Sequence, residues 1–107
     1  MSDWKDPIHP GEILADELAE IGISGTTLAH SIGVPENRIY QILKKQRNIT
    51  ADTALRLGKF FDTGADFWLN LQKAYELDVA QQEIGQKLES IVPYRKRTDL
   101  ALPVEAG

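Results

Sequence analysis

Apolar residues recur along this chain of 107 residues with a spacing of about 3.6, in short runs that glycine and proline interrupt. Alternation of apolar and polar residues never persists long enough to predict a strand. A chain of this length forms one small domain. Because it contains no cysteine, its core depends on packing alone. We therefore predict an all-α fold.

Small polar residues, prolines and glycines indicate where the helices begin and end. The predicted N-caps of the second, fourth and fifth helices are Ser24, Thr50 and Asp66. Pro10 and Pro35 are predicted in the first turns of the first and third helices, because proline suits that position. Glycine is expected to end the first two helices, at Gly22 and Gly33.

Each predicted helix has an apolar face. The residues expected to face the core are Ile13, Leu14, Leu18, Ile21, Leu28, Ala29, Ile32, Ile39, Ile42, Leu43, Ala54, Leu57, Gly58, Phe61, Phe67, Trp68, Leu71, Ala74 and Tyr75. An additional C-terminal helix is predicted from the apolar positions Ile84, Leu88, Ile91 and Val92. We therefore divide the chain into a domain at residues 1–79, a helix at 80–92 and a flexible tail at 93–107.

The charges are segregated along the chain, although the net charge is −4. Residues 1–37 contain seven acids and one base, and residues 62–92 contain six acids and two bases. Between them, residues 38–61 contain Asp52 and six bases, namely Arg38, Lys44, Lys45, Arg47, Arg56 and Lys59. A basic segment between acidic ones can bind a polyanion even when the whole chain is acidic.

Four residues in the second and third predicted helices have the spacing of a helix-turn-helix. Ala29, Gly33, Ile39 and Ile42 follow one another at intervals of four, six and three. They supply a small residue where two helices cross, a residue that tolerates positive φ at the turn, and two apolar residues that hold the second helix. A plain helical hairpin is the alternative. The spacing favours the unit that inserts a helix into the DNA major groove.

The third helix has a polar face opposite its apolar one. A rotation of about 100° per residue from Ile39 places three polar residues opposite the core, namely Asn37, Gln41 and Lys44. The flanks of this face are Tyr40 on one side and Arg38 and Lys45 on the other. Asn and Gln can pair with adenine, whereas Lys and Arg can contact guanine or phosphate. Asn37 and Gln41 are therefore the predicted base readers.

Four more residues are candidates at the edges of this face. Glu36 can accept a hydrogen bond from cytosine, or it can merely stabilise the helix dipole. Thr26 and Thr27 open the second helix, where free backbone N–H groups and hydroxyls suit a phosphate, although these residues can also serve only to cap that helix. Arg47 follows the third helix and is predicted to contact the DNA backbone; a solvated charge is the alternative.

An enzyme is not expected. His9 and His30 are the only histidines, and no Ser, His and acid string or glycine-rich phosphate loop is present. Glu12, Asp16 and Glu20 share a helix face, but exposed acids are commoner there than metal ligands. We predict no metal and no cofactor. No signal-peptide pattern or long apolar run occurs, so we expect a soluble, cytoplasmic protein without a membrane partner.

Four stretches together resemble a known family. They are HPGEIL at 9–14, LAHSIGV at 28–34, RNITADTALRLGKFF at 47–61 and FWLNLQKAYEL at 67–77. From Ile8 to about Leu77 the chain resembles the HigA or VapI group of antitoxins, within the lambda-repressor-like (Xre-type) helix-turn-helix superfamily. The fold that this resemblance implies is a lambda-repressor-like domain of five helices, to which the predicted C-terminal helix is added.

The resemblance also implies partners. Members of the group form homodimers, neutralise a HigB-type toxin that is a RelE-like ribonuclease, and repress their own operon by binding double-stranded DNA. Such toxins are basic, so the acidic residues Asp16, Glu17 and Glu20, with Asp3, Trp4 and Asp6 ahead of them, are a candidate toxin-binding surface; a solvated acidic face is the alternative. Ile84, Leu88, Ile91 and Val92 are a candidate dimer interface, or they fold back on the core.

Lys45 departs from the family pattern. Members usually have a glycine at this position, after the helix that reads DNA. A residue with a Cβ must either adopt positive φ there or let the helix continue. Two alternatives to the antitoxin remain open: a stand-alone repressor of other genes, and a protein-binding module that no longer binds DNA. Lys45 slightly favours the second of these.

Overall fold

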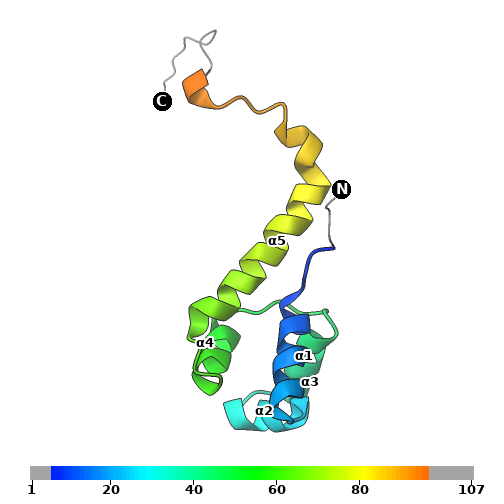
Figure 1. Ribbon diagram of the computed structural model, residues 1–107, viewed down its shortest axis with the longest axis vertical. Helices are drawn as coiled ribbons and strands as arrows, with labels where there is room; N and C mark the ends of the chain where they lie inside the picture. The colour runs from blue at the N-terminus through cyan, green and yellow to red at the C-terminus, as the bar shows by residue number, and fades with distance from the viewer. Residues whose placement is uncertain (1–5, 97–107) are drawn as a thin grey trace.

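The computed structural model describes residues 6–96 as a set of helices. They are α1 (Pro10–Ile21), α2 (Gly25–Ile32), α3 (Glu36–Leu43), α4 (Ala51–Phe60), α5 (Ala65–Leu88) and a single 3-10 turn, η1 (Tyr94–Lys96). Residues 6–96 contain no strand, and the prediction of an all-α domain of five helices is confirmed. Helices α1 to α4 gather around one end of α5 (Figure 1).

Local sequence signals set most helix ends as predicted. α1 begins with a capping box, in which His9 Nδ1 accepts the N–H of Gly11 at 2.9 Å and the Glu12 carboxylate accepts the N–H of His9 at 3.3 Å. Ser24 and Thr50 cap α2 and α4. The prediction for Asp66 is wrong, because α5 already starts at Ala65 after Gly64, and no side chain caps it.

The third helix starts one residue later than predicted. Pro35 is the residue before α3 rather than its first residue, and its backbone is extended, with φ −63° and ψ 145°. The fixed φ of proline suits either position, so the ψ angle decides where the helix begins. The polar face of α3 is unaffected by this shift.

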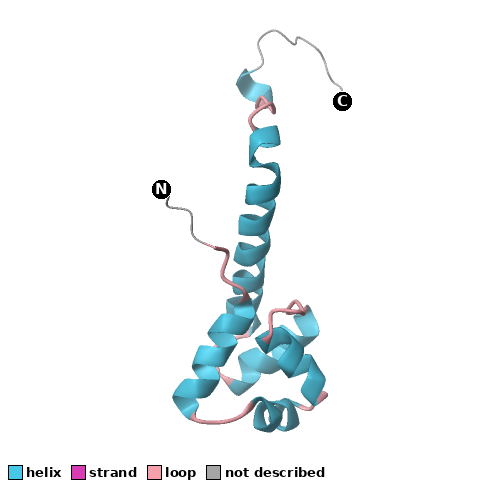
Figure 2. Ribbon diagram, turned by 90° about the vertical axis from the view of Figure 1, so that its right-hand side faces the viewer, coloured by secondary structure: helices cyan, strands magenta, loops and turns pink. Residues whose placement is uncertain are grey.

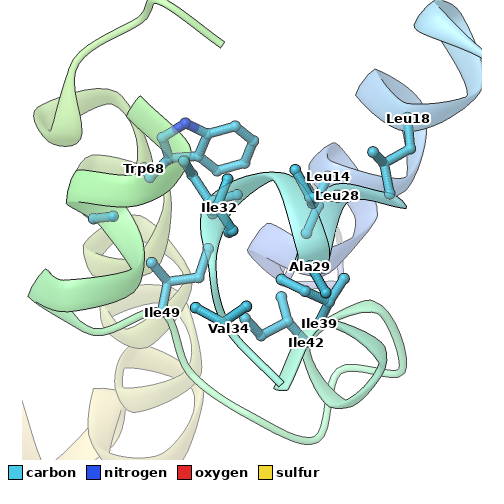
Figure 3. Packing of buried hydrophobic residues seen from close by; sticks show 12 residues of the cluster. Leu14, Leu18, Leu28, Ala29, Ile32, Val34, Ile39, Ile42, Ile49 and Trp68 are labelled. Carbon is cyan, nitrogen blue, oxygen red and sulfur yellow. The ribbon is translucent and has the colours of Figure 1, made fainter. Parts of the chain in front are cut away.

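The core lies between α1, α2, α3, α4 and the first two turns of α5. It consists of Leu14, Leu18, Leu28, Ala29, Ile32, Val34, Ile39, Ile42, Ile49, Ala54, Leu57 and Trp68. The indole of Trp68 brings α5 against this cluster (Figure 3). Ile21, Phe67 and Ala74 were predicted to face inward and are exposed. Ile21 ends α1, Phe67 lies beside Trp68 on the outer side of α5, and Ala74 lies beyond the last buried position of that helix.

Helix α5 leaves the core after its second turn. Trp68 and Gln72 are its buried residues, Tyr75 still packs against His9 at the start of α1, and the C-terminal half projects away from the other helices (Figures 1 and 2). Its 24 residues correspond to about 36 Å. The additional C-terminal helix predicted at 80–92 is not a separate element, because no glycine or proline interrupts the chain between Ala65 and Ile84. Ile91 and Val92 lie beyond the end of α5.

Two further expectations concern the ends of the chain. Within the predicted tail at 93–107, residues 94–96 form the turn η1, and residues 97–107 lie outside the described residues. Asp3 and Trp4 also lie outside them. Among residues 6–96, no helix combines the length and the apolar composition that crossing a membrane requires.

Candidate nucleic-acid interface

Helices α2 and α3 form the helix-turn-helix, and each residue of the predicted spacing occupies its expected place. Gly33 has φ 73°, and the N–H of Val34 bonds to the carbonyl of Ala29 at 3.0 Å, which closes the turn. Ala29, Ile39 and Ile42 are fully buried and lie close together in Figure 3. The opposite, polar side of α3 is therefore left facing outward.

Two close helix contacts hold α3 in place. A Cβ on Gly11 would overlap the carbonyl oxygen of Ile42, so α1 approaches the backbone of α3 directly. A Cβ on Gly25 would lie 2.9 Å from the ring of Tyr40, so α2 rests on that ring. Because neither glycine has a side chain, both helices approach α3 closely, and its orientation is tightly constrained.

The start of α2 contacts one flank of α3 through hydrogen bonds. The hydroxyl of Tyr40 accepts a hydrogen bond from the N–H of Thr26 at 3.2 Å and lies 3.1 Å from Oγ1 of Thr26. The same Oγ1 of Thr26 donates to the carboxylate of Glu36 at 3.2 Å. The N–H of Thr27 is bonded to Ser24 Oγ at 3.0 Å. The expectation of free backbone N–H groups at Thr26 and Thr27 is therefore wrong. The hydroxyl of Thr26 is also occupied by Glu36, so of these two residues only Thr27 keeps a hydroxyl proton for a phosphate.

Glu36 also lies close to the end of α2. Its carboxylate is 3.3 Å from Nε2 of His30, and both side chains are well exposed. Glu36 thus contacts two residues of α2 and stabilises the contact between the two helices of the motif. Both alternatives given above for Glu36 omit this role, because a contact between helices is not visible within α3 alone.

The predicted base reader Gln41 is paired with the predicted phosphate contact Arg47. Nε of Arg47 donates to Oε1 of Gln41 at 2.8 Å. An arginine only donates hydrogen bonds, so it fixes the carbonyl side of the amide and leaves the NH₂ group outward. Bidentate pairing with adenine needs both ends of the amide, and it therefore requires Gln41 to release Arg47.

The other flank of α3 is joined to α4. Nη1 of Arg38 donates to Oδ1 of Asp52 at 3.1 Å, and Nε of Arg56 donates to the same oxygen at 2.8 Å. These two guanidinium groups, that of Arg56 foremost, lower the pKa of Asp52. The prediction missed both Asp52 and Arg56. Their spacing of four within α4 was the one available signal, because nothing in the sequence indicates the contact with α3.

The backbone at Lys45 shows how this chain accommodates a residue other than glycine after α3. It adopts φ 64°, the left-handed conformation that a glycine would take there. Its N–H bonds to the carbonyl of Ile42 at 2.9 Å, and the N–H of Gln46 bonds to that of Gln41 at 2.8 Å, so the helix ends in the usual glycine-type turn. Its Nζ lies 3.8 Å from the carboxylate of Glu12. Lys45 has kept the turn at the cost of backbone strain.

Asn37 and Lys44 lie on the outward face and are exposed, as predicted. Of the six bases in the basic segment, Arg38, Arg56 and Lys45 form ion pairs with acids among the described residues. The three others, Lys44, Arg47 and Lys59, form none there, so most of the uncompensated positive charge lies at the end of α3, in the loop after it and on α4.

His9 connects the start of α1 to α5. The side chain is almost fully buried and packs edge-on against the ring of Tyr75 with centroids 4.8 Å apart. Burial is the main cause that lowers its pKa. His9 was predicted to belong to a helix entry, and it also connects that entry to α5.

Comparison with known proteins identifies a matching family and similar proteins. The helix-turn-helix family HTH_3 matches residues 14–68. Virulence-associated protein I of Dichelobacter nodosus is 48% identical over 87 residues, which cover 80% of each chain. A solved antidote protein of a HigA family from Coxiella burnetii is 51% identical with a TM-score of 0.81, covering 84% of this chain and all of that one.

A second solved relative was determined with DNA. The antitoxin HigA of Pseudomonas aeruginosa, described in complex with the higBA promoter, is 47% identical with a TM-score of 0.77, and the match covers 82% of this chain and 98% of that one. Neither solved relative is described as an enzyme, in agreement with the prediction of a binding protein.

Proposed function

This chain belongs to the helix-turn-helix family HTH_3 and, within it, to the HigA/VapI group of antitoxins, and from that premise we propose that it is an operator-binding antitoxin. In this proposal it binds its own promoter as a homodimer, represses its operon and neutralises a HigB-type toxin that cleaves messenger RNA. The observation that carries the proposal is the outward polar face of α3, held in place by α1 and α2.

DNA binding is the first part of the proposal. Asn37 and Gln41 lie at the centre of the outward face of α3, where a recognition helix contacts base edges. Lys44, Lys45 and Arg47 follow at its C-terminal end, where a DNA backbone passes. The solved HigA relative, described with the higBA promoter, supports promoter binding by a chain of this fold.

The test compares binding to the promoter of the protein's own operon with binding to a scrambled duplex. Asn37→Ala is expected to reduce promoter affinity by roughly 5- to 150-fold and to leave scrambled DNA nearly unaffected, because a base contact is worth about 1–3 kcal/mol. Lys44→Ala is the matched control on the same face. It is expected to weaken both duplexes equally and to reduce the salt slope by about 0.9. Equal loss on both duplexes for Asn37→Ala would remove it from the readers.

The dimer is the second part. In the projecting half of α5, Leu77, Ile84 and Leu88 are spaced by seven and four, so they form one apolar stripe. Their exposed fractions are 62%, 40% and 38%, and the described part of the chain does not fold back over them. Ile91 and Val92, which follow the end of α5, are exposed as well. A second copy that packs along the stripe would cover it and pair two recognition helices.

Light scattering measures the mass of the full chain. Leu88→Glu is expected to convert a dimer to a monomer and to weaken promoter binding, because each half-site then binds alone. Leu55→Glu is the control, since Leu55 on α4 is exposed to 64% and lies off the stripe. A dimer that survives Leu88→Glu with Ile84→Glu would place the interface elsewhere.

Toxin binding is the third part. Asp16, Glu17 and Glu20 lie on α1, and Asp16 and Glu20 are exposed. None of the ion pairs among residues 6–96 involves these three acids, so their charge is available to a basic partner.

The product of the adjacent gene is the partner to test. Co-purification is expected for the native chain and is expected to be lost when Asp16 and Glu20 are both reversed to lysine. Reversal of Asp78 and Glu83 on α5 changes the net charge equally and is expected to leave the complex intact. If neither charge reversal abolishes co-purification, the toxin-binding surface lies elsewhere on the protein. If no ribonuclease partner is found, a stand-alone Xre-type regulator is favoured.

A further inference from the structure

A series of contacts made by charged side chains links α4 to both helices of the helix-turn-helix. Arg56 donates from Nη1 to the carbonyl oxygens of Ile32 at 2.7 Å and Gly33 at 3.3 Å, and from Nε to Asp52 at 2.8 Å. Asp52 in turn accepts from Arg38 on α3 at 3.1 Å. One oxygen of Asp52 therefore holds two guanidinium groups.

The contact of Arg56 with α2 fixes one end of this series of contacts. The last four carbonyls of a helix have no partner within it and carry the negative end of the helix dipole. Arg56 satisfies the carbonyl of Ile32 and that of Gly33 just beyond it, at the turn of the motif. This fixes the guanidinium of Arg56, which in turn orients the carboxylate of Asp52.

The other end of this series of contacts is Arg38, on the flank of α3. The side chain of Arg38 is only 27% exposed, so few orientations are open to it, whereas Asp52 is exposed to 57%. The Arg38 guanidinium uses Nη1 for Asp52, which leaves its other N–H groups available. It is thereby held at the edge of the face that carries Asn37 and Gln41.

We propose that Asp52 and Arg56 are positioning residues for DNA binding, which orient the guanidinium of Arg38 toward a phosphate of the duplex. This inference rests on the DNA binding proposed above. Neither residue needs to touch DNA. Their effect is to order the Arg38 side chain before binding, so that its ordering entropy is not lost when the complex forms.

The proposal and simple electrostatics predict opposite changes in promoter affinity when the charge of Asp52 is removed. If Asp52 is only a surface acid near DNA, its removal reduces repulsion and promoter affinity rises. If Asp52 positions Arg38, its removal frees that side chain and promoter affinity falls. Asp52→Asn tests this with little change of shape.

The chain contains a closely matched control. Asp66 has the same place in α5 that Asp52 has in α4, the second residue of the helix after an alanine. Asp66→Asn therefore removes the same charge and the same interaction with the helix dipole, without touching an arginine contact described here. We expect Asp52→Asn to lower promoter affinity by roughly fivefold, the scale of the entropy lost when one long side chain is ordered on binding, and Asp66→Asn to leave it unchanged or slightly higher.

Three further measurements complete the experiment. In the Arg38→Ala background, Asp52→Asn is expected to lose its effect on promoter affinity, because the side chain that Asp52 orients is no longer present. Asp52→Glu keeps a carboxylate and is expected to recover part of the affinity. The ¹⁵N heteronuclear NOE of the Arg38 Nε, measured on the free full chain, is expected to fall in Asp52→Asn while the backbone amides of α3 keep their native values.

A rise in affinity for Asp52→Asn, or an unchanged Arg38 NOE, overturns the proposal. A loss equal to that of Asp66→Asn also overturns it, since charge or helix stability then accounts for the effect. If the native chain does not bind its promoter, the proposed function fails, and the NOE measurement still decides whether Asp52 orders Arg38.

Discussion

Lys45→Gly is expected to make the protein more stable. Lys45 has φ 64°, and a left-handed conformation costs a residue with a Cβ about 1–2 kcal/mol. Glycine removes this cost, but it loses about 0.4–1 kcal/mol through the greater freedom of the unfolded chain. The ion pair with Glu12 is half-exposed at 3.8 Å, so we count about 0.3 kcal/mol for its loss. The net gain is about 0.5 kcal/mol.

Urea unfolding measures this gain, and Lys45→Ala is the matched control. Alanine removes the same ion pair and the same charge but keeps the Cβ, so Lys45→Gly should exceed Lys45→Ala by about 0.8 kcal/mol. Both variants should reduce the salt slope of promoter binding by the same amount, about 0.9, if Lys45 contacts a phosphate. Equal stability of the two variants would refute the argument from backbone strain, and an unchanged slope would remove Lys45 from the DNA contacts.

Three more predictions concern His9 at the start of α1 and two residues, Gly11 and Tyr40, at the helix contacts of α3. Burial lowers the pKa of His9 below its usual 6.5, so the unfolded chain binds more protons, and stability should fall as pH decreases below 6.5; His9→Asn keeps a cap and should flatten urea-measured stability between pH 5 and 7. Gly11→Ala places a methyl group against the carbonyl of Ile42 and should cost about 1–3 kcal/mol, seen as a lower Tm, whereas an unchanged Tm would contradict the close approach of the helices. Tyr40→Phe removes the hydroxyl bonded to Thr26 and should cost about 1 kcal/mol in urea unfolding; no loss would mean that water replaces it.

Interactions within a few residues were predictable from the sequence. The ends of α1, α2 and α4 follow from His9-Pro10, Ser24 and Thr50, because capping depends on groups within one turn. The spacing from Ala29 to Ile42 fixed the helix-turn-helix and the face of α3 that points outward, since helical periodicity determines both. At Lys45 the sequence left two conformations open, and the structure has the one with positive φ.

Contacts between helices were decided by the tertiary structure. The pairs Arg38–Asp52 and Arg56–Ile32 join residues 14 and 24 positions apart, and they exist because core packing sets how α2, α3 and α4 cross. The same packing occupies the N–H of Thr26 with the hydroxyl of Tyr40. The sequence therefore determined which surface is offered to DNA, and the fold determined which groups on that surface already have partners.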